Sequence, residues 1–193
     1  MIEAYEAQKL STKEFYRQLQ EWIAPRTLVD KTPVYALDIE ILHRMESDFR
    51  DARYIHLVRH PYGTVYSFIE AKLDQVFFRY AHPFSRRVLA ELIWIISHQN
   101  ILAFLQSVPA ERQHRMAFEQ LVRDPEGVMR DLCRFLGIEF HPCLVQPYDG
   151  ERMTDGIQPG VQMVGDFKFY LRDKIDPEVA DRWKRFHTTD FLS

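Results

Sequence analysis

Residues Tyr54–Val58 place the strongest constraint on the fold of this chain. The run YIHLV is apolar at nearly every position, which is typical of a strand buried on both faces of a parallel sheet. The polar triplet Arg59, His60 and Pro61 ends the run, and Pro61 is well placed in the first turn of a following helix. A buried strand that leads directly into a helix indicates an α/β protein.

Strands and helices alternate over much of the chain. The residue patterns predict strands at 27–30, 54–58 and 115–118 and helices at 11–23, 35–48, 61–70, 84–106 and 124–137. This order predicts a central parallel sheet covered by helices on both faces. Three strands make a small sheet for this class. From about residue 141 the chain is irregular, apart from a short helix near 177–186.

Capping residues mark several of the predicted helix ends. Ser11 with Glu14 forms the pattern of a capping box. Asp124 and Pro125 are typical of a helix start, and Gly137 is typical of a helix end.

Composition excludes several functional classes. A length of 193 residues suits one domain, and a net charge of −3 argues against a general nucleic-acid binder. Two cysteines make neither a disulfide framework nor a four-ligand zinc site. Charged residues throughout the N-terminal segment exclude a signal peptide or membrane span there. We therefore expect a cytoplasmic protein with no metal and with no membrane or nucleic-acid partner.

Cationic residues follow two of the predicted strands. Open α/β sheets bind ligands beyond the carboxyl ends of their strands, where Lys31 and Arg59 are expected to enter one crevice. Ser67, eight residues after Arg59, adds a hydroxyl. Arg presents a planar fork to a phosphate, whereas Lys acts as a point charge. The pattern alone leaves open that Arg59 pairs with a carboxylate and that Lys31 is solvated.

Four segments resemble, in order, the sulfotransferases that use 3′-phosphoadenosine 5′-phosphosulfate (PAPS). They are VDKTPVY, ARYIHLVRHPYGTVYSF, FEQLVRDPEGVMRDLCRFLGIEF and GDFKF, between about residues 28 and 170. The resemblance implies a three-layer P-loop-type sulfotransferase fold and PAPS as co-substrate. It also implies that Arg59 and Ser67 bind the 3′-phosphate of PAPS and that Phe118 lies near the adenine. Gly165, Asp166 and Lys168 match the segment that helps to close the nucleotide site.

The resemblance further implies an in-line attack of a substrate hydroxyl on sulfur. Lys31 matches the residue that stabilises the leaving phosphate. The resemblance does not assign the residue that deprotonates the acceptor hydroxyl, because Pro33 stands where some members of the family have a histidine. His98 is our candidate because it lies on an inward helical face, and a hydrogen-bonded core histidine is the alternative. His56 and His60 are weaker candidates, and Glu91 could either orient His98 or lie on the surface.

The family's first strand and phosphate-binding loop have no counterpart in residues 1–30, which contain no glycine. Backbone N–H groups of such a loop supply much of an anion cradle. The chain is therefore expected to be a single domain, 1–193, that is either N-terminally truncated or a degenerate relative. The intact pattern around Arg59 favours truncation.

The segment from Glu70 to Leu105 and the run MTDGI are similar to sulfotransferase domains of modular polyketide synthases. That similarity implies a β-hydroxyacyl acceptor on a carrier protein and neighbouring synthase domains as partners. A small molecule that carries a hydroxyl group is the alternative acceptor. The aromatic stretch 77–84 is either a lid over an acyl chain or ordinary core.

Two alternatives belong to other classes. The first is a non-catalytic interaction module built on a truncated sulfotransferase fold. The second, a nucleotide kinase, is disfavoured because the chain has no Gly-rich loop with its Lys.

Overall fold

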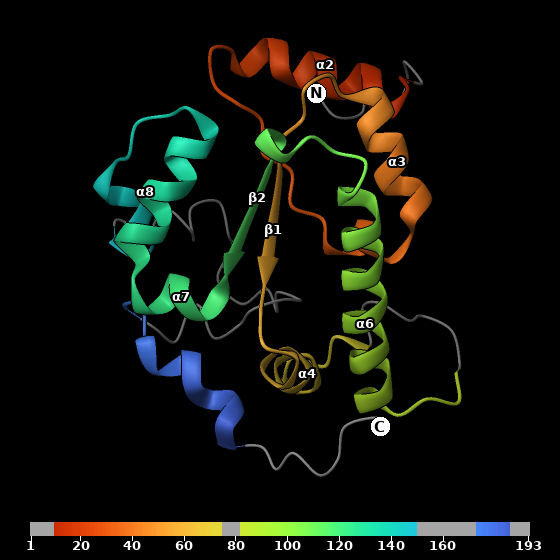
Figure 1. Cartoon of the computed structure of the whole chain (residues 1–193), viewed down its shortest axis with the longest axis vertical. Helices are drawn as coiled ribbons and strands as arrows, with labels where there is room; N and C mark the ends of the chain where they lie inside the picture. The colour runs from red at the N-terminus through yellow and green to blue at the C-terminus, as the bar shows by residue number, and fades with distance from the viewer. Residues whose placement is uncertain (1–9, 75–81, 150–172, 186–193) are drawn as a thin grey trace, which may run out of the picture.

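The computed structural model describes residues 10–74, 82–149 and 173–185. Its elements are α2 (Thr12–Ile23), the 3₁₀ helix η1 (Pro33–Leu37), α3 (Ile39–Asp48), β1 (Tyr54–Val58), α4 (Pro61–Glu70), α6 (Arg86–Leu105), η2 (Ala110–Arg112), β2 (Gln113–Ala117), α7 (Phe118–Arg123), α8 (Pro125–Leu136), η3 (Pro142–Val145) and η6 (Pro177–Arg185). In Figure 1 the two strands lie at the centre, with α3 and α6 on one side and α7 and α8 on the other.

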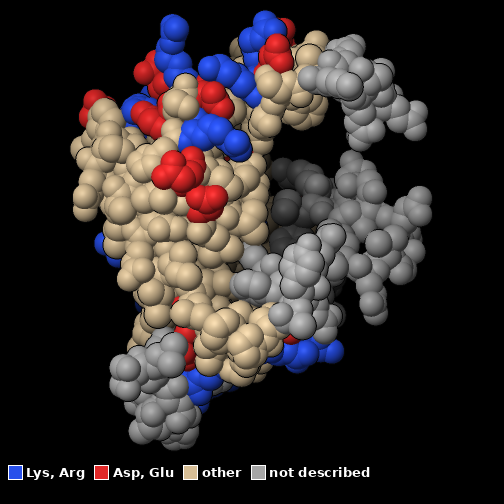
Figure 2. Space-filling view, turned by 90° about the vertical axis from the view of Figure 1, so that its right-hand side faces the viewer, with Lys and Arg blue, Asp and Glu red and all other residues tan. Residues whose placement is uncertain are grey.

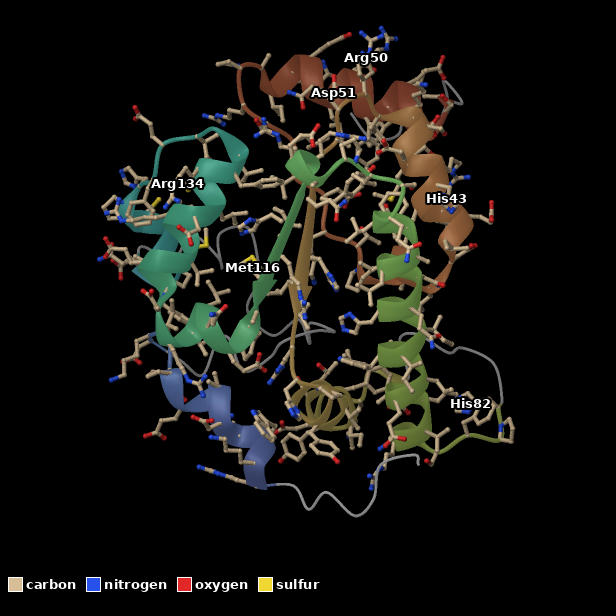
Figure 3. The ribbon with its side chains drawn as sticks, viewed as in Figure 1. His43, Arg50, Asp51, His82, Met116 and Arg134 are labelled. Carbon is tan, nitrogen blue, oxygen red and sulfur yellow. The ribbon has the colours of Figure 1, made fainter. Side chains whose placement is uncertain are left out.

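The strands β1 and β2 form a parallel pair whose register runs from Tyr54 opposite Gln113 to Val58 opposite Ala117. Successive side chains of a strand point to opposite faces. On one face His56 contacts His98 of α6, and on the other His114 stacks against Phe135 of α8 with ring centroids 5.0 Å apart. Figure 3 shows Met116 on the α8 side of β2. The predicted parallel sheet between helical layers is confirmed.

The strand predicted at 27–30 is wrong, and the sheet has two strands rather than three within the described residues. The N–H of Leu28 donates to Oε1 of Gln20 at 3.2 Å, and Nε2 of Gln20 donates to the carbonyl of Arg26 at 2.8 Å. Val29 is 71% exposed. An apolar run becomes a strand only when another strand pairs with it, and here a side chain of α2 takes the backbone bond instead.

Two predicted boundaries also need correction. Phe118 begins α7 instead of ending the strand, which spans Gln113–Ala117. The helix predicted at 35–48 is divided into η1 and α3 at Asp38, whose carboxylate accepts the N–H of Glu40 at 3.0 Å. Because Asp38 caps the N-terminus of α3, the preceding helix η1 ends there.

The predicted caps are confirmed. The N–H of Ser11 donates to the carboxylate of Glu14 at 2.8 Å, and the N–H of Glu14 donates to Oγ of Ser11 at 3.3 Å. Asp124 accepts the N–H of Gly127 at 2.9 Å. Gly137 ends α8 with φ of 70°, the left-handed conformation that favours glycine. These ends depend only on residues within one helical turn.

Three apolar clusters join the layers. Leu42, Phe104 and Val108 form the first, between α3 and α6, and Tyr54 of β1 packs against it. The second joins α4 to α6 through Val65, Phe68 and Ala90. The third joins α7 to η6 through Val122, Val179 and Ala180. The third cluster holds the C-terminal η6 against a helix that directly follows β2.

By length and composition α6 is the one helix in the described part of the chain that could cross a membrane. In α6 22% of the apolar window is buried, and its buried residues are Leu89, Ala90, Glu91 and Phe104. Figure 2 views the side that carries α3 and α6, where Lys, Arg, Asp and Glu gather towards the ends and leave a broad uncharged area between them.

Replacement of Phe104 by alanine tests the first cluster. The ring is 2% exposed and packs edge-on against Tyr54 at 5.0 Å between centroids. We expect Phe104→Ala to lower the free energy of unfolding by about 3–5 kcal/mol in urea denaturation, because it removes buried surface and leaves a cavity. Leu102→Ala on the outer face of α6, where Leu102 is 55% exposed, is the control and should cost about 0.5 kcal/mol or less. Equal losses would contradict this packing.

Candidate functional site

A cavity of about 550 Å³ lies at the carboxyl ends of β1 and β2. Its lining residues come from the ends of both strands, α6, α7 and η6: Val58, Arg59, His60, Pro61, Trp94, Arg115, Glu119, Arg123, Asp181, Trp183 and Lys184. This is the edge at which open α/β sheets bind their ligands.

Basic side chains outnumber carboxylates in this cavity. Arg59, Arg115, Arg123 and Lys184 line it together with Glu119 and Asp181. Asp181 accepts from Arg123 at 2.8 Å and from Lys184 at 2.6 Å, and these bonds lower the pKa of the Asp181 carboxyl. One carboxylate is thus shared by two cations, so the cavity as a whole favours an anionic ligand.

Arg59 is held at the cavity by contacts from three elements. Its guanidinium lies over the ring of Phe118, 4.4 Å from the centroid, in a cation–π contact. Its carbonyl accepts the indole N–H of Trp94 at 3.2 Å. A Cβ at Gly63 would lie 3.2 Å from Nε of Arg59, so glycine leaves room for this side chain on the first turn of α4.

His60 joins the end of β1 to α7 and η6. Its backbone N–H donates to the carboxylate of Glu119 at 2.9 Å. Its ring stacks on Trp183 with centroids 3.7 Å apart and planes 9° apart. Burial lowers the pKa of His60, although the charge of Glu119 opposes that shift. The stacked rings make a flat aromatic wall at the cavity.

His98 points inward from α6 towards β1. Its Nδ1 lies 2.9 Å from Nε2 of His56, and its ring centroid lies 4.4 Å from that of Trp94. His98 is therefore one side chain away from the cavity that Trp94 lines. Glu91, by contrast, is buried at 2% exposure and pairs with Arg87 at 2.9 Å. The polar side chain that contacts His98 is thus His56, and the surface role considered for Glu91 is wrong.

Both histidines are held neutral near pH 7. Burial, assisted by the charges of His98 and Arg115, lowers the pKa of His56 to about 4. Burial and the charge of Arg115 also lower the pKa of His98. A neutral imidazole is the form that accepts a proton from a substrate.

The structure brings only some of the predicted site residues together. Arg59 lines the cavity, with Phe118 packed beneath it and against the cluster of α7 and η6. Ser67 is half-buried on α4 and Lys31 is exposed between α2 and η1, and neither lines the cavity. Within the described residues Lys31 and Arg59 do not line one crevice, because no paired strand there ends before Lys31.

Three other predicted residues, Gly165, Asp166 and Lys168, lie outside the described residues, as does most of the stretch 77–84. Within the described ranges, no three His, Cys, Asp or Glu side chains gather as a metal ion would require.

Sequence reasoning missed Trp183, Arg123, Lys184 and Arg115. Arg123 lies within the recognised segment that begins at Phe118, and Arg115 lies in the predicted strand just before it, so their place at the same strand end as Arg59 was a usable signal. Trp183 and Lys184 carry no local motif. Only the packing of η6 on α7 brings them to the strand ends.

A sequence model described as the sulfotransferase family matches residues 2–142. The chain belongs to the sulfotransferase family. Among solved structures, this sulfotransferase-family chain is similar to the sulfotransferase domain from the curacin biosynthetic pathway. The two are 41% identical with a TM-score of 0.90, over 100% of this chain and 67% of that chain.

The sulfotransferase domain from the Synechococcus PCC 7002 olefin synthase is also similar. It is 38% identical with a TM-score of 0.79, over 94% of this chain and 59% of that one. No curated protein matches the chain. The predicted family and α/β sulfotransferase fold are confirmed, and the chain spans about three fifths to two thirds of the length of these domains.

The buried His56 should make stability depend on pH. Its pKa is about 4 in the folded chain and ordinarily 6.5, so the unfolded chain binds the proton first as pH falls. The contribution of neutral His56 to the free energy of unfolding is complete above about pH 6.5. It declines towards pH 4 by up to about 1.4 kcal/mol per pH unit. Urea denaturation between about pH 7 and pH 5 measures this slope.

His56→Phe should flatten that slope. Replacement of the exposed His82 by Gln is the control and should leave it unchanged. A slope that His56→Phe does not alter would show that burial of His56 is not its source.

Proposed function

We propose that this protein is a PAPS-dependent sulfotransferase that moves a sulfonate group from PAPS to a hydroxyl acceptor. The observation that carries the proposal is the cationic cavity at the strand ends, in which Arg59 is held over Phe118. PAPS is a polyanion with a flat base. The cavity offers it basic side chains and the aromatic wall of His60 and Trp183.

Arg59 is the proposed ligand of the 3′-phosphate, because a guanidinium can bind two phosphate oxygens at once. Phe118 supports this role, because the Arg59 guanidinium lies over the face of its ring and is held there. Ser67 is proposed to add a hydroxyl to the same group. Gly165, Asp166 and Lys168 are proposed to help close the nucleotide site.

In the proposed reaction, the acceptor oxygen forms a bond to sulfur while the bond from sulfur to the 5′-phosphate oxygen breaks. The departing electron pair stays on that phosphate oxygen, so the products are a sulfate ester and adenosine 3′,5′-bisphosphate. Lys31 is proposed, on the family resemblance alone, as the partner of the leaving oxygen, since its exposed side chain is not among the residues that line the cavity. His98 is the proposed base, because its neutral imidazole lies next to the cavity wall at Trp94.

The proposed acceptor is a β-hydroxyacyl chain on a carrier protein, with neighbouring synthase domains as partners. Support comes from the two similar domains, which belong to the curacin biosynthetic pathway and to an olefin synthase. We propose the cytoplasm as the compartment of this reaction.

Nucleotide binding tests the assignment of Arg59. We expect Arg59→Ala to weaken binding of adenosine 3′,5′-bisphosphate by about 1.5–3 kcal/mol in isothermal titration calorimetry, the value of a hydrogen bond to a charged group. Arg134→Ala on α8 is the matched control, because Arg134 is exposed and pairs with Asp131 away from the cavity (Figure 3). An affinity that Arg59→Ala leaves unchanged would refute the assignment.

Transfer of radiolabelled sulfonate from PAPS separates an enzyme from an interaction module. We expect the chain to label a β-hydroxyacyl group on a carrier protein and to label it faster than a free small alcohol, because binding energy from the carrier assists positioning. Nucleotide binding without transfer to either acceptor would instead support the non-catalytic alternative.

A further inference from the structure

His56 is a buried polar residue in the middle of an otherwise apolar strand. It is 7% exposed, and it faces α6 with its Nε2 2.9 Å from Nδ1 of His98. A buried imidazole costs free energy unless it makes a hydrogen bond. Its contact with His98 supplies that bond and ties the orientation of one ring to the other.

The bond between the two rings leaves two arrangements of protons. A neutral imidazole carries one N–H and one nitrogen lone pair. If His98 carries its proton on Nδ1 and donates to His56, Nε2 of His98 keeps its lone pair. If His56 is the donor, the lone pair on Nδ1 of His98 is used and its Nε2 carries hydrogen. Only the first arrangement leaves His98 able to accept a proton.

Trp94 and Arg115 are further neighbours that act on His98. The ring of Trp94 packs against it at 4.4 Å between centroids, and the indole N–H of Trp94 already donates to the carbonyl of Arg59. Arg115 on β2 is a permanent positive charge whose field opposes protonation of both histidines. Trp94 and His56 therefore hold the ring from two sides.

We propose that His56 is a positioning residue, which accepts the Nδ1–H of His98 and so fixes the tautomer whose Nε2 takes the proton of the acceptor hydroxyl. This inference rests on the proposed function of His98 as the base. In the step, the O–H bond of the acceptor breaks and its proton moves to Nε2 of His98. The electron pair left on the acceptor oxygen forms the new O–S bond, while the bond from sulfur to the 5′-phosphate oxygen breaks and its electron pair leaves on that phosphate. The imidazolium of His98 keeps its Nδ1–H bond to a neutral His56.

Nitrogen-15 NMR of the imidazole rings in the full chain tests the tautomer directly. Near neutral pH we expect His98 to carry hydrogen on Nδ1 and to show an unprotonated Nε2. His56→Gln, whose amide oxygen can accept the same bond, should keep that tautomer. His56→Phe, of similar size without an acceptor, should shift His98 towards the form protonated on Nε2. A wild-type His98 protonated on Nε2 would overturn the proposal, as would a tautomer that His56→Phe leaves unchanged.

Kinetics with PAPS and a carrier-bound hydroxyacyl chain provide the second measurement. His56→Phe should lower kcat by at least about 10-fold, as expected when a general base loses its correct protonation state. It should leave the affinity for adenosine 3′,5′-bisphosphate unchanged, which also shows that the variant is folded. His56→Gln should recover most of the rate, and equal loss in both variants would contradict positioning through an accepted hydrogen bond.

The two measurements separate this inference from the function on which it rests. If the NMR result is as expected but the wild-type chain transfers no sulfonate, the proposed function fails while the tautomer assignment holds. If the chain is active but His98 carries hydrogen on Nε2, the positioning role of His56 fails while the sulfotransferase activity stands.

Discussion

The parallel pairing of β1 with β2 is the interaction on which the candidate site depends. The register from Tyr54–Gln113 to Val58–Ala117 makes the two strands end at the same level. The residues that follow each strand therefore leave the sheet next to each other. The stacking of Arg59 on Phe118 and the bond from the N–H of His60 to Glu119 both result from this arrangement.

Packing around this pair sets the chemistry of the side chains. On the α6 face, burial and the charge of Arg115 keep His56 and His98 neutral, which suits proton transfer better than ion pairing. At the strand ends, an apolar cluster holds η6 on α7 and adds Trp183 and Lys184 from a distant part of the chain. The same fold thus places a neutral imidazole pair next to the wall of a basic cavity.

Prediction from sequence succeeded where the relevant chemistry is local. The capping box at Ser11, the left-handed Gly137 and the βα unit from Tyr54 to Glu70 all depend on neighbours within a few residues. The strand at 27–30 failed because its apolar residues say nothing about a pairing partner. At the site, the motif around Arg59 placed that residue correctly at the strand ends, whereas Lys31 lost its expected place together with the missing strand.

The helix ends, the buried strand Tyr54–Val58, the cationic Arg59 at its end and the likeness to sulfotransferases could all be predicted from the residue order alone. These follow from backbone conformation, capping and ordered motifs, which are properties of short segments. The pairing of His56 with His98 and the stacking of Trp183 on His60 became visible only in the folded chain. Those contacts join residues far apart in the chain, and they form because burial of apolar surface brings α6 against β1 and η6 against α7.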